Sequence, residues 1–275
     1  MILSHYQTRQ LTEKNTPSQH ALSVDLGRST VTVEKTAQGW QMPDGQVLSF
    51  SQVSSITKDQ NSCFQFIDGQ LKKVEAFSDF SQRYYSLMPT SAAPTLLISG
   101  IPMHRIKETT PLEDTREKIR ALGKPQGMVL DTAAGLGYTA MEAARSADRV
   151  ITVEYDPAVL KICRLNPWSQ GLFTSPNISP VIGDSADLVH VFQGSIFNAI
   201  IHDPPMFSLA GHLYSQAFYY DLFRILKPRG RLFHYIGNPD SRIGAGVGRG
   251  VVERLQKAGF SVKPKKSAFG VLATK

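Results

Sequence analysis

One segment of the chain, residues 128–140, constrains the fold more than any other. An apolar run, Met128–Leu130, leads through Asp131 into a turn that contains Gly135 and Gly137. A buried strand followed by a glycine turn and a helix is the nucleotide-binding element of open α/β sheets. The glycines also fit the dinucleotide fingerprint G-x-G-x-x-A. Asp131 argues against a dinucleotide, because a carboxylate repels a pyrophosphate and attracts a ligand with a cationic centre and an amine.

The two halves of the chain have different sequence patterns. Up to about residue 100, short β-rich runs alternate with turn dipeptides such as Asp44-Gly45 and Asp68-Gly69, and a short helix is predicted over 51–58. Farther along, a helix predicted over 111–122 precedes short apolar strands that alternate with helices. These strands are predicted over 128–130, 150–153, 180–182, 199–201 and 231–235. The pattern predicts an α/β domain over 101–275, with a mostly parallel sheet covered on both faces, and a small β-rich or α+β domain over 1–100.

A carboxylate stands at the end of each of the first four strands of this α/β domain. The four acids are Asp131, Glu154, Asp184 and Asp203. Ligands of open α/β sheets bind at the carboxyl ends of the strands, and Glu154 has the spacing from Asp131 of an acid that binds ribose hydroxyls. Asp184 is placed to accept a hydrogen bond from an adenine amino group. Taken singly, each acid could be a surface or capping carboxylate, and an N-cap is the more usual role for Asp184; the ordered set favours a binding site.

Residues 128–140, 150–160, 180–184 and 199–208 resemble the successive motifs of class I S-adenosylmethionine-dependent methyltransferases. The resemblance covers most of 110–275 and implies a Rossmann-like domain with a seven-stranded, mostly parallel sheet that ends in an antiparallel pair near 262 and 270–273. It implies S-adenosylmethionine as the cofactor, whose sulfonium and amine suit a carboxylate. The implied cofactor-binding residues are Asp131, Ala133, Gly135, Gly137, Glu154, Tyr155, Asp184, Ser185 and Asp203. The family commonly has glycine at the position of Ala133.

Two shorter resemblances concern the substrate. Residues 99–105, 166–169 and 201–211 resemble a narrower group of predicted methyltransferases frequent in archaea. The run Asp-Pro-Pro-Met-Phe at 203–207 resembles the loop of methyltransferases that act on planar nitrogens, in which the acid and a proline carbonyl accept hydrogen bonds from the target amine and an aromatic ring stacks on the target. This resemblance implies catalytic roles for Asp203, Pro204, Pro205 and Phe207. The aromatic residue comes one place later than usual, as in some ribosomal RNA methyltransferases. The alternative is a stiff loop after a strand.

Composition bears on the partner and the location. The net charge of +7 permits an anionic partner such as RNA. Cys63 and Cys163 form no metal-type spacing, so no metal is predicted, and a reducing, cytoplasmic setting is expected without a signal peptide or a membrane span. We therefore predict an S-adenosylmethionine-dependent methyltransferase that acts on a base nitrogen of RNA. The alternatives are a methyltransferase of a small metabolite or protein side chain, an aminopropyltransferase that uses the decarboxylated donor, an NAD(P) dehydrogenase and a non-catalytic RNA-binding module.

Three weaker signals lie in the last third of the chain. The glycine-rich run 237–250 predicts a flexible loop, with substrate contact as the alternative. His202, His212 and His234 fall near the predicted sheet edge, where a histidine serves either as a general base or, more often, as a packed or solvated residue. The aromatic residues of 214–220 predict a helix packing face, with a lid over the substrate as the alternative.

Overall fold

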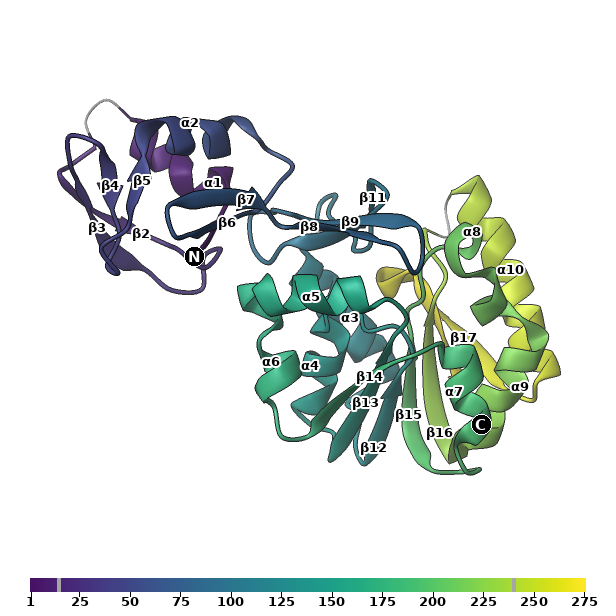
Figure 1. Ribbon diagram of the computed structural model, residues 1–275. Helices are drawn as coiled ribbons and strands as arrows, with labels where there is room; N and C mark the ends of the chain where they lie inside the picture. The colour runs from purple at the N-terminus through teal and green to yellow at the C-terminus, as the bar shows by residue number, and fades with distance from the viewer. Residues whose placement is uncertain (14–15, 239–240) are drawn as a thin grey trace. The chain divides into compact units, whose positions relative to one another are not determined.

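The computed structural model describes residues 1–13, 16–238 and 241–275, and only the backbone of residues 242–245. The chain forms two compact units (Figure 1). Met1–Leu112 and Ala158–Gln170 make up the first unit, and Glu113–Pro157 and Gly171–Lys275 make up the second. The predicted domain boundary at residue 100 stays a prediction. None of the helices in the described ranges combines the length and the apolar character that crossing a bilayer requires.

The first unit contains three small sheets with antiparallel pairing. They are β1 (Ile2–Leu3), β6 (Phe64–Ile67) and β7 (Gln70–Lys73); β2 (Gln19–Leu22), β3 (Val31–Lys35), β4 (Gly39–Gln41) and β5 (Val47–Ser49); and β8 (Glu75–Ser78), β9 (Arg83–Met88), β10 (Thr95–Ile98) and β11 (Ile101–Pro102). The helices α1 (His5–Thr8) and α2 (Phe50–Lys58) accompany them. The predicted hairpin at Asp68-Gly69 is confirmed: both residues have positive φ, as a two-residue turn between β6 and β7 requires.

A later stretch of the chain completes the first unit. It contains most of α5 (Pro157–Leu165) and the 3-10 turn Pro167–Ser169. The indole Nε1 of Trp168 donates to the carbonyl of Leu26 at 3.0 Å. The guanidinium of Arg28 lies over the Trp168 ring, 5.9 Å from its centroid, and donates to the carbonyl of Pro167. The loop after β2 is therefore fastened to a segment that lies about 140 residues later in the sequence.

The second unit is built on one seven-stranded sheet. Its order is β14 (Ile178–Ile182), β13 (Arg149–Glu154), β12 (Met128–Asp131), β15 (Phe197–His202), β16 (Leu226–Tyr235), β18 (Gly270–Thr274) and β17 (Ser261–Lys265). The first five strands are parallel, and β18 is antiparallel to both of its neighbours. This arrangement confirms the predicted α/β class, the Rossmann-like sheet and its final antiparallel pair. The strand order reverses between β12 and β15, which makes the carboxyl ends of these two strands the expected ligand crevice.

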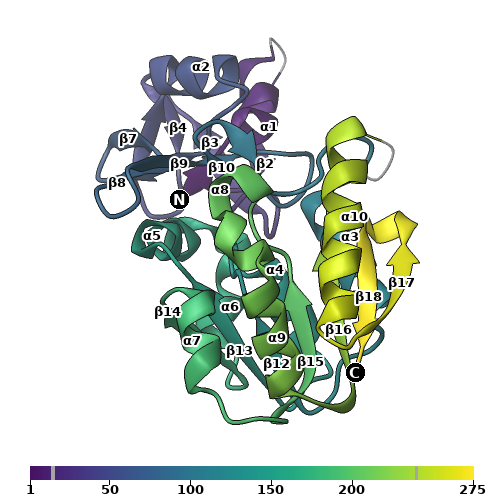
Figure 2. The same cartoon turned by 90° about the vertical axis from the view of Figure 1, so that its right-hand side faces the viewer.

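Helices cover both faces of this sheet (Figures 1 and 2). The helices of the second unit are α3 (Pro111–Leu122, from Glu113 on), α4 (Tyr138–Ala144), α6 (Gly171–Thr174), α7 (Ser185–Val191), α8 (Phe207–Ala210), α9 (Gln216–Ile225) and α10 (Arg242–Lys257). The row α7, α9 and α10 packs on one face, and its core includes Phe197, Ile200, Tyr219, Leu222 and Leu255, all buried. The aromatic run at 214–220 is thus confirmed as mainly a packing face, although Tyr220 is exposed.

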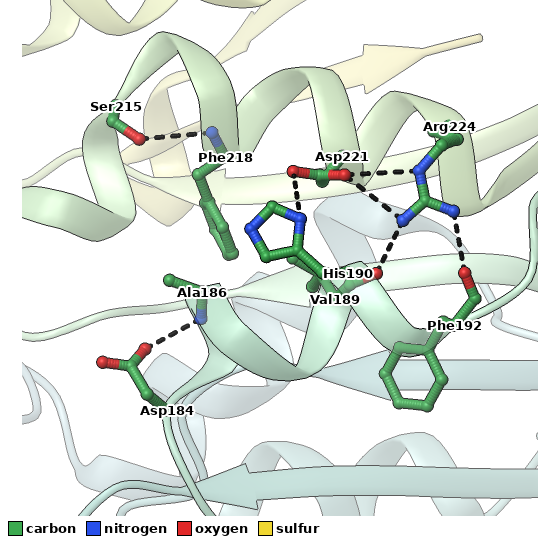
Figure 3. A network of polar contacts seen from close by, with 9 residues as sticks. All are labelled: Asp184, Ala186, Val189, His190, Phe192, Ser215, Phe218, Asp221 and Arg224. Carbon is green, nitrogen blue, oxygen red and sulfur yellow. Dashed lines mark hydrogen bonds and ion pairs between the residues drawn. The ribbon is translucent and has the colours of Figure 1, made fainter.

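Arg224 fastens α9 to the end of α7 (Figure 3). Its guanidinium donates to the carbonyls of Val189 and Phe192, both at 2.7 Å, and pairs with Asp221, which also contacts His190. Carbonyls at the end of a helix lack partners within the helix, and a cation there also complements the helix dipole. Arg224 thus holds the carboxyl end of α7. Asp184 lies at the amino end of the same helix, on the same edge of the sheet as Asp131.

The flexible loop predicted over 237–250 is wrong from Arg242 on, where α10 begins, and residues 239–240 of that run lie outside the described residues. Glycine has a poor helix propensity, but packing overrides it here. Val251 and Leu255 of α10 are fully buried against the sheet. A Cβ at Gly248 would lie 3.0 Å from Ile236 Cδ1, so the absence of a side chain allows a close approach at that point.

Candidate active site at the sheet edge

Asp131 is fully buried at the end of β12. Its Oδ2 accepts hydrogen bonds from the hydroxyls of Thr152 at 2.9 Å and Thr139 at 3.1 Å. The other oxygen, Oδ1, is also buried and has no hydrogen bond of ordinary geometry to any described residue. Burial raises the pKa of Asp131 to about 7, helped by the charge of Asp203 and opposed by the two threonines and the backbone amide of Ala133. A buried acid with an unused acceptor oxygen is poised to receive a cationic or hydrogen-bonding ligand.

Glu154 ties the glycine turn to the next strand. Its Oε2 accepts from the amide of Gly135 at 2.9 Å, and its Oε1 accepts from the amide of Asp156 at 3.0 Å. Burial raises the pKa of Glu154 to about 7, against the effect of the backbone amides of Asp156, Gly135 and Tyr155. Each carboxylate oxygen can accept more than one hydrogen bond, so the contacts leave capacity for ribose hydroxyls. That role stays a prediction.

The two glycines of the turn have different surroundings. Both have positive φ, 51° at Gly135 and 77° at Gly137. A Cβ at Gly135 would meet nothing within 4 Å, whereas a Cβ at Gly137 would lie 2.9 Å from Leu172 Cδ2. Gly135 therefore borders open space into which a ligand can approach, and Gly137 is needed for packing.

We expect the two alanine substitutions to separate these roles. Gly135→Ala should weaken binding of an adenosine-containing ligand at least about 10-fold, because a methyl group blocks close backbone approach, and should cost about 1 kcal/mol of stability. Gly137→Ala should lower the unfolding free energy more, by roughly 1–3 kcal/mol, because it also overpacks against Leu172. Calorimetric titration and thermal melts measure both effects. Equal losses of stability and unchanged ligand affinity in Gly135→Ala would contradict this assignment.

Asp184 caps α7, as its surroundings in the sequence predict. Its Oδ1 accepts from the amide of Ala186 at 2.8 Å (Figure 3), and its Oδ2 lies 3.0 Å from Nε2 of His212. The neighbouring Ser185 is buried and donates its hydroxyl to the carbonyl of Thr132 at 2.6 Å. Tyr155, by contrast, is well exposed. Their predicted contacts with an adenine stay predictions.

Asp203 begins the loop that follows β15. Its Oδ2 lies 2.6 Å from Nζ of Lys118, a side chain that is only 1% exposed. In the same loop, the hydroxyl of Tyr214 donates to the carbonyl of Pro205 at 3.0 Å. Phe207 is half-exposed at the start of α8, and its ring centroid lies 5.4 Å from that of Tyr214. Pro204 and Pro205 therefore sit in a loop that Tyr214 and Lys118 hold at either side.

Lys118 is the functional candidate that sequence reasoning missed. A lysine late in a helix is accounted for without any function, because a cation there complements the helix dipole. A usable signal was present: Asp114 and Lys118 are four residues apart, which places them on one face of a helix. Nothing in the sequence connects that face with Asp203.

The buried histidines are packed residues. His202 Nε2 donates to the carbonyl of Leu213 at 3.0 Å, which leaves Nδ1 to accept from the hydroxyl of Thr132 at 2.7 Å. Burial lowers the pKa of His202 to about 3 and lowers that of His234 well below its ordinary value. His234 lies 2.8 Å from the Tyr219 hydroxyl and is fully buried. The structure thus favours packing over a general-base role for these two residues.

Known proteins resemble the chain in sequence and in structure. It is 44% identical over 261 residues to an uncharacterized protein, MJ1233, of Methanocaldococcus jannaschii, with 92% of this chain and 88% of that protein covered. It is 34% identical over 118 residues to the polyamine aminopropyltransferase of Sulfolobus acidocaldarius, with 40% and 39% covered. A crystal structure of a spermidine synthase in complex with the transition-state analogue AdoDATO matches with a TM-score of 0.59 at 19% identity, over 77% of this chain and 79% of that one. No family model matches the chain.

These relatives overturn two predictions. The prediction of methyl transfer to an RNA base is wrong, and so is the prediction of S-adenosylmethionine as the cofactor, because relatives that are 30%, 34% and 31% identical over parts of the chain are polyamine aminopropyltransferases. The reason for the error is physical. A sulfonium and an amine suit Asp131 equally well whether or not the donor also carries a carboxylate, so the acid and the glycine turn could not distinguish the two donors.

Proposed function

The chain belongs to the same family as the uncharacterized protein MJ1233, and we propose, from its similarity to polyamine aminopropyltransferases, that it is an aminopropyltransferase. In this proposal, the enzyme moves the 3-aminopropyl group of decarboxylated S-adenosylmethionine to an amine of an aliphatic polyamine. The polyamine aminopropyltransferases among its relatives support the reaction class. The seven-stranded sheet supplies a crevice for the adenosine part of the donor.

The observation that carries the proposal is the similarity to polyamine aminopropyltransferases, and the charge of the sheet edge is compatible with their donor. Asp131 and Glu154 are buried there, and neither has a cationic partner among the residues that the structure describes. The decarboxylated donor carries a sulfonium and an ammonium and has no carboxylate, so its net charge is positive throughout. These two acids suit the sulfonium and the amine of the intact donor equally well, so the choice of the decarboxylated donor rests on the relatives.

The residues at the edge divide the task of binding the donor. Gly135 leaves room for the backbone to approach the adenosine, and Glu154 offers acceptor capacity for the ribose hydroxyls. Oδ1 of Asp131 would accept from the ammonium of the aminopropyl group. Asp184 and Ser185, at the start of α7, would lie beside the adenine.

The transfer is an in-line displacement at carbon. The lone pair of the acceptor nitrogen attacks the propyl carbon bound to sulfur, the C–N bond forms, and the C–S bond breaks with its electron pair going to sulfur. The products are neutral methylthioadenosine and a substituted ammonium. An alkylamine is mostly protonated near neutral pH, so it must lose one proton before it attacks. Asp203, held at the end of β15, would accept that proton and orient the amine.

A direct assay tests the proposal. Purified protein is incubated with decarboxylated S-adenosylmethionine and a panel of aliphatic diamines, and both methylthioadenosine and the aminopropylated amine are quantified. The expected result is stoichiometric formation of both products, with kcat/KM at least about 100-fold higher than for any transfer from intact S-adenosylmethionine. Methylated amine from the intact donor, with no methylthioadenosine from the decarboxylated one, would overturn it.

A further inference from the structure

Lys118 lies between two carboxylates at the candidate active site. Its Nζ is 2.6 Å from Oδ2 of Asp203 and 2.8 Å from Oδ2 of Asp114, and Asp114 is itself fully buried. The ammonium also lies over the Tyr235 ring, 4.5 Å from its centroid. Removing an ammonium from water is costly unless it is paired, so these contacts form a set in which each member depends on the others.

The geometry assigns separate tasks to the two residues of α3. Asp114 and Lys118 are one helical turn apart and form a pair within the helix, so the ammonium is oriented by its own helix. The same ammonium then reaches the end of β15, which is remote in sequence, and contacts Asp203. The three side chains together carry two negative charges and one positive charge.

The interaction has a reciprocal electrostatic effect. Burial by itself would lower the pKa of Lys118, but the carboxylates of Asp203 and Asp114 raise it above its ordinary value. The attraction between two charges is mutual, so the ammonium favours the ionised form of Asp203 by the same amount. Asp203 is therefore kept as a carboxylate while it remains at the edge of the site.

We infer that Lys118 and Asp114 are positioning residues for the proposed transfer: Asp114 orients Lys118, and Lys118 keeps Asp203 charged and fixed in orientation toward a cationic acceptor amine. The inference deepens the proposed function and rests on it. The single net negative charge of the three side chains matches an alkylammonium group. It makes an aliphatic amine a better acceptor for this site than an uncharged hydroxyl or a carboxylate.

Besides Lys118, two described groups have a pKa that responds to the charge of Asp203, and they are Asp131 and Tyr214. The charge of Asp203 adds to burial in raising the pKa of Asp131. It also raises the pKa of Tyr214, after the larger effects of burial and Tyr219. Tyr214 therefore stays neutral below about pH 10. Asp131 is thus the neighbour that titrates in the working range, and the experiment must separate its titration from that of Asp203.

Two variants with opposite effects on charge test the inference. Lys118→Met removes the cation and should move the acid limb of kcat/KM for a diamine upward by about one to three pH units. Asp114→Asn leaves the cation to Asp203 alone, so the acid limb should move downward, and KM for the diamine should rise because the net negative charge is lost. Lys118→Arg should retain the wild-type limb, and Lys124→Met, at an exposed lysine just after the same helix, is the matched control.

The outcomes distinguish electrostatic positioning from a merely structural role. Unshifted limbs, or shifts in the same direction, in Lys118→Met and Asp114→Asn would overturn the inference; if Lys118→Met does not fold, Asp114→Asn and Lys118→Arg decide. A carbon-13 NMR titration of the Asp203 carboxyl requires no turnover. The signal is assigned by its loss in Asp203→Asn, and the titration is repeated in Asp131→Asn, where Asp131 no longer ionises. The pKa of Asp203 should rise in Lys118→Met and fall in Asp114→Asn. This titration tests the contact of Lys118 with Asp203 even if the wild-type protein transfers no aminopropyl group. Absence of transfer would refute the proposed function and leave this contact standing.

Discussion

Asp203→Asn is expected to lower kcat for aminopropyl transfer by roughly 100- to 10,000-fold, the usual contribution of a positioned acid–base group. The amide has the shape of the carboxylate but cannot accept a proton from the incoming ammonium. Lys118 would keep its contact with Asp114, so the fold should persist. Single-turnover rates measured with a saturating diamine report the loss, and donor affinity by calorimetry should change by less than about threefold.

Asp187→Asn is the matched control for this substitution. Asp187 is an exposed acid in α7, on the same unit as Asp203. It should retain wild-type kcat. If Asp203→Asn keeps more than a tenth of the wild-type rate, the acid does not take the proton, and the assignment of Asp203 fails.

Asp131→Asn is expected to act on binding and on stability in opposite directions. The substitution removes the charge that would receive the donor's ammonium, so donor affinity should fall roughly 10- to 100-fold, as when a charge-assisted hydrogen bond is lost. The hydroxyls of Thr139 and Thr152 remain available to the amide. Calorimetric titration with decarboxylated S-adenosylmethionine measures the change.

The stability effect follows from the raised pKa of Asp131. The folded protein holds the Asp131 proton up to about pH 7, whereas an ordinary aspartate releases it near 3.8. Between these two values the folded state binds more protons than the unfolded state, so stability falls as pH rises through this window. Asp131→Asn removes the penalty and should raise the melting temperature at pH 8, with the gain shrinking toward pH 4. The difference in melting temperature between Asp131→Asn and wild type is measured at both pH values. If this gain is no larger at pH 8 than at pH 4, the buried charge of Asp131 is compensated and the prediction is wrong.

The central sheet was predictable because its signals are local. Each of the strands β12, β13, β15 and β16 contains an apolar run, and the predicted segments fall within the observed strands. The helix α10 was not predictable from local signals. Its residues Gly246, Gly248 and Gly250 favour a loop in isolation, and only the burial of Val251 against the sheet makes the helix stable.

The candidate site was predictable in part for the same reason. The positions of four acids at strand ends were predictable, because each follows its own apolar run; they are Asp131, Glu154, Asp184 and Asp203. Lys118 reaches Asp203 across 85 residues, and no local pattern encodes a contact at that distance. The nature of the donor was beyond a sequence argument based on charge, since the two candidate donors differ by the presence of a carboxylate and share every group that the predicted motifs would bind.

The fastening of Trp168 to Leu26 restricts how this protein could be rearranged by recombination. The first unit is completed by residues 158–170, which are inserted between two strands of the other unit. A gene fragment that encodes residues 1–112 would lack this insert, and a fragment that encodes the rest would carry it without its partner. The two units are therefore expected to be inherited together, and neither is a cassette that gene fusion could transfer to another protein without redesign.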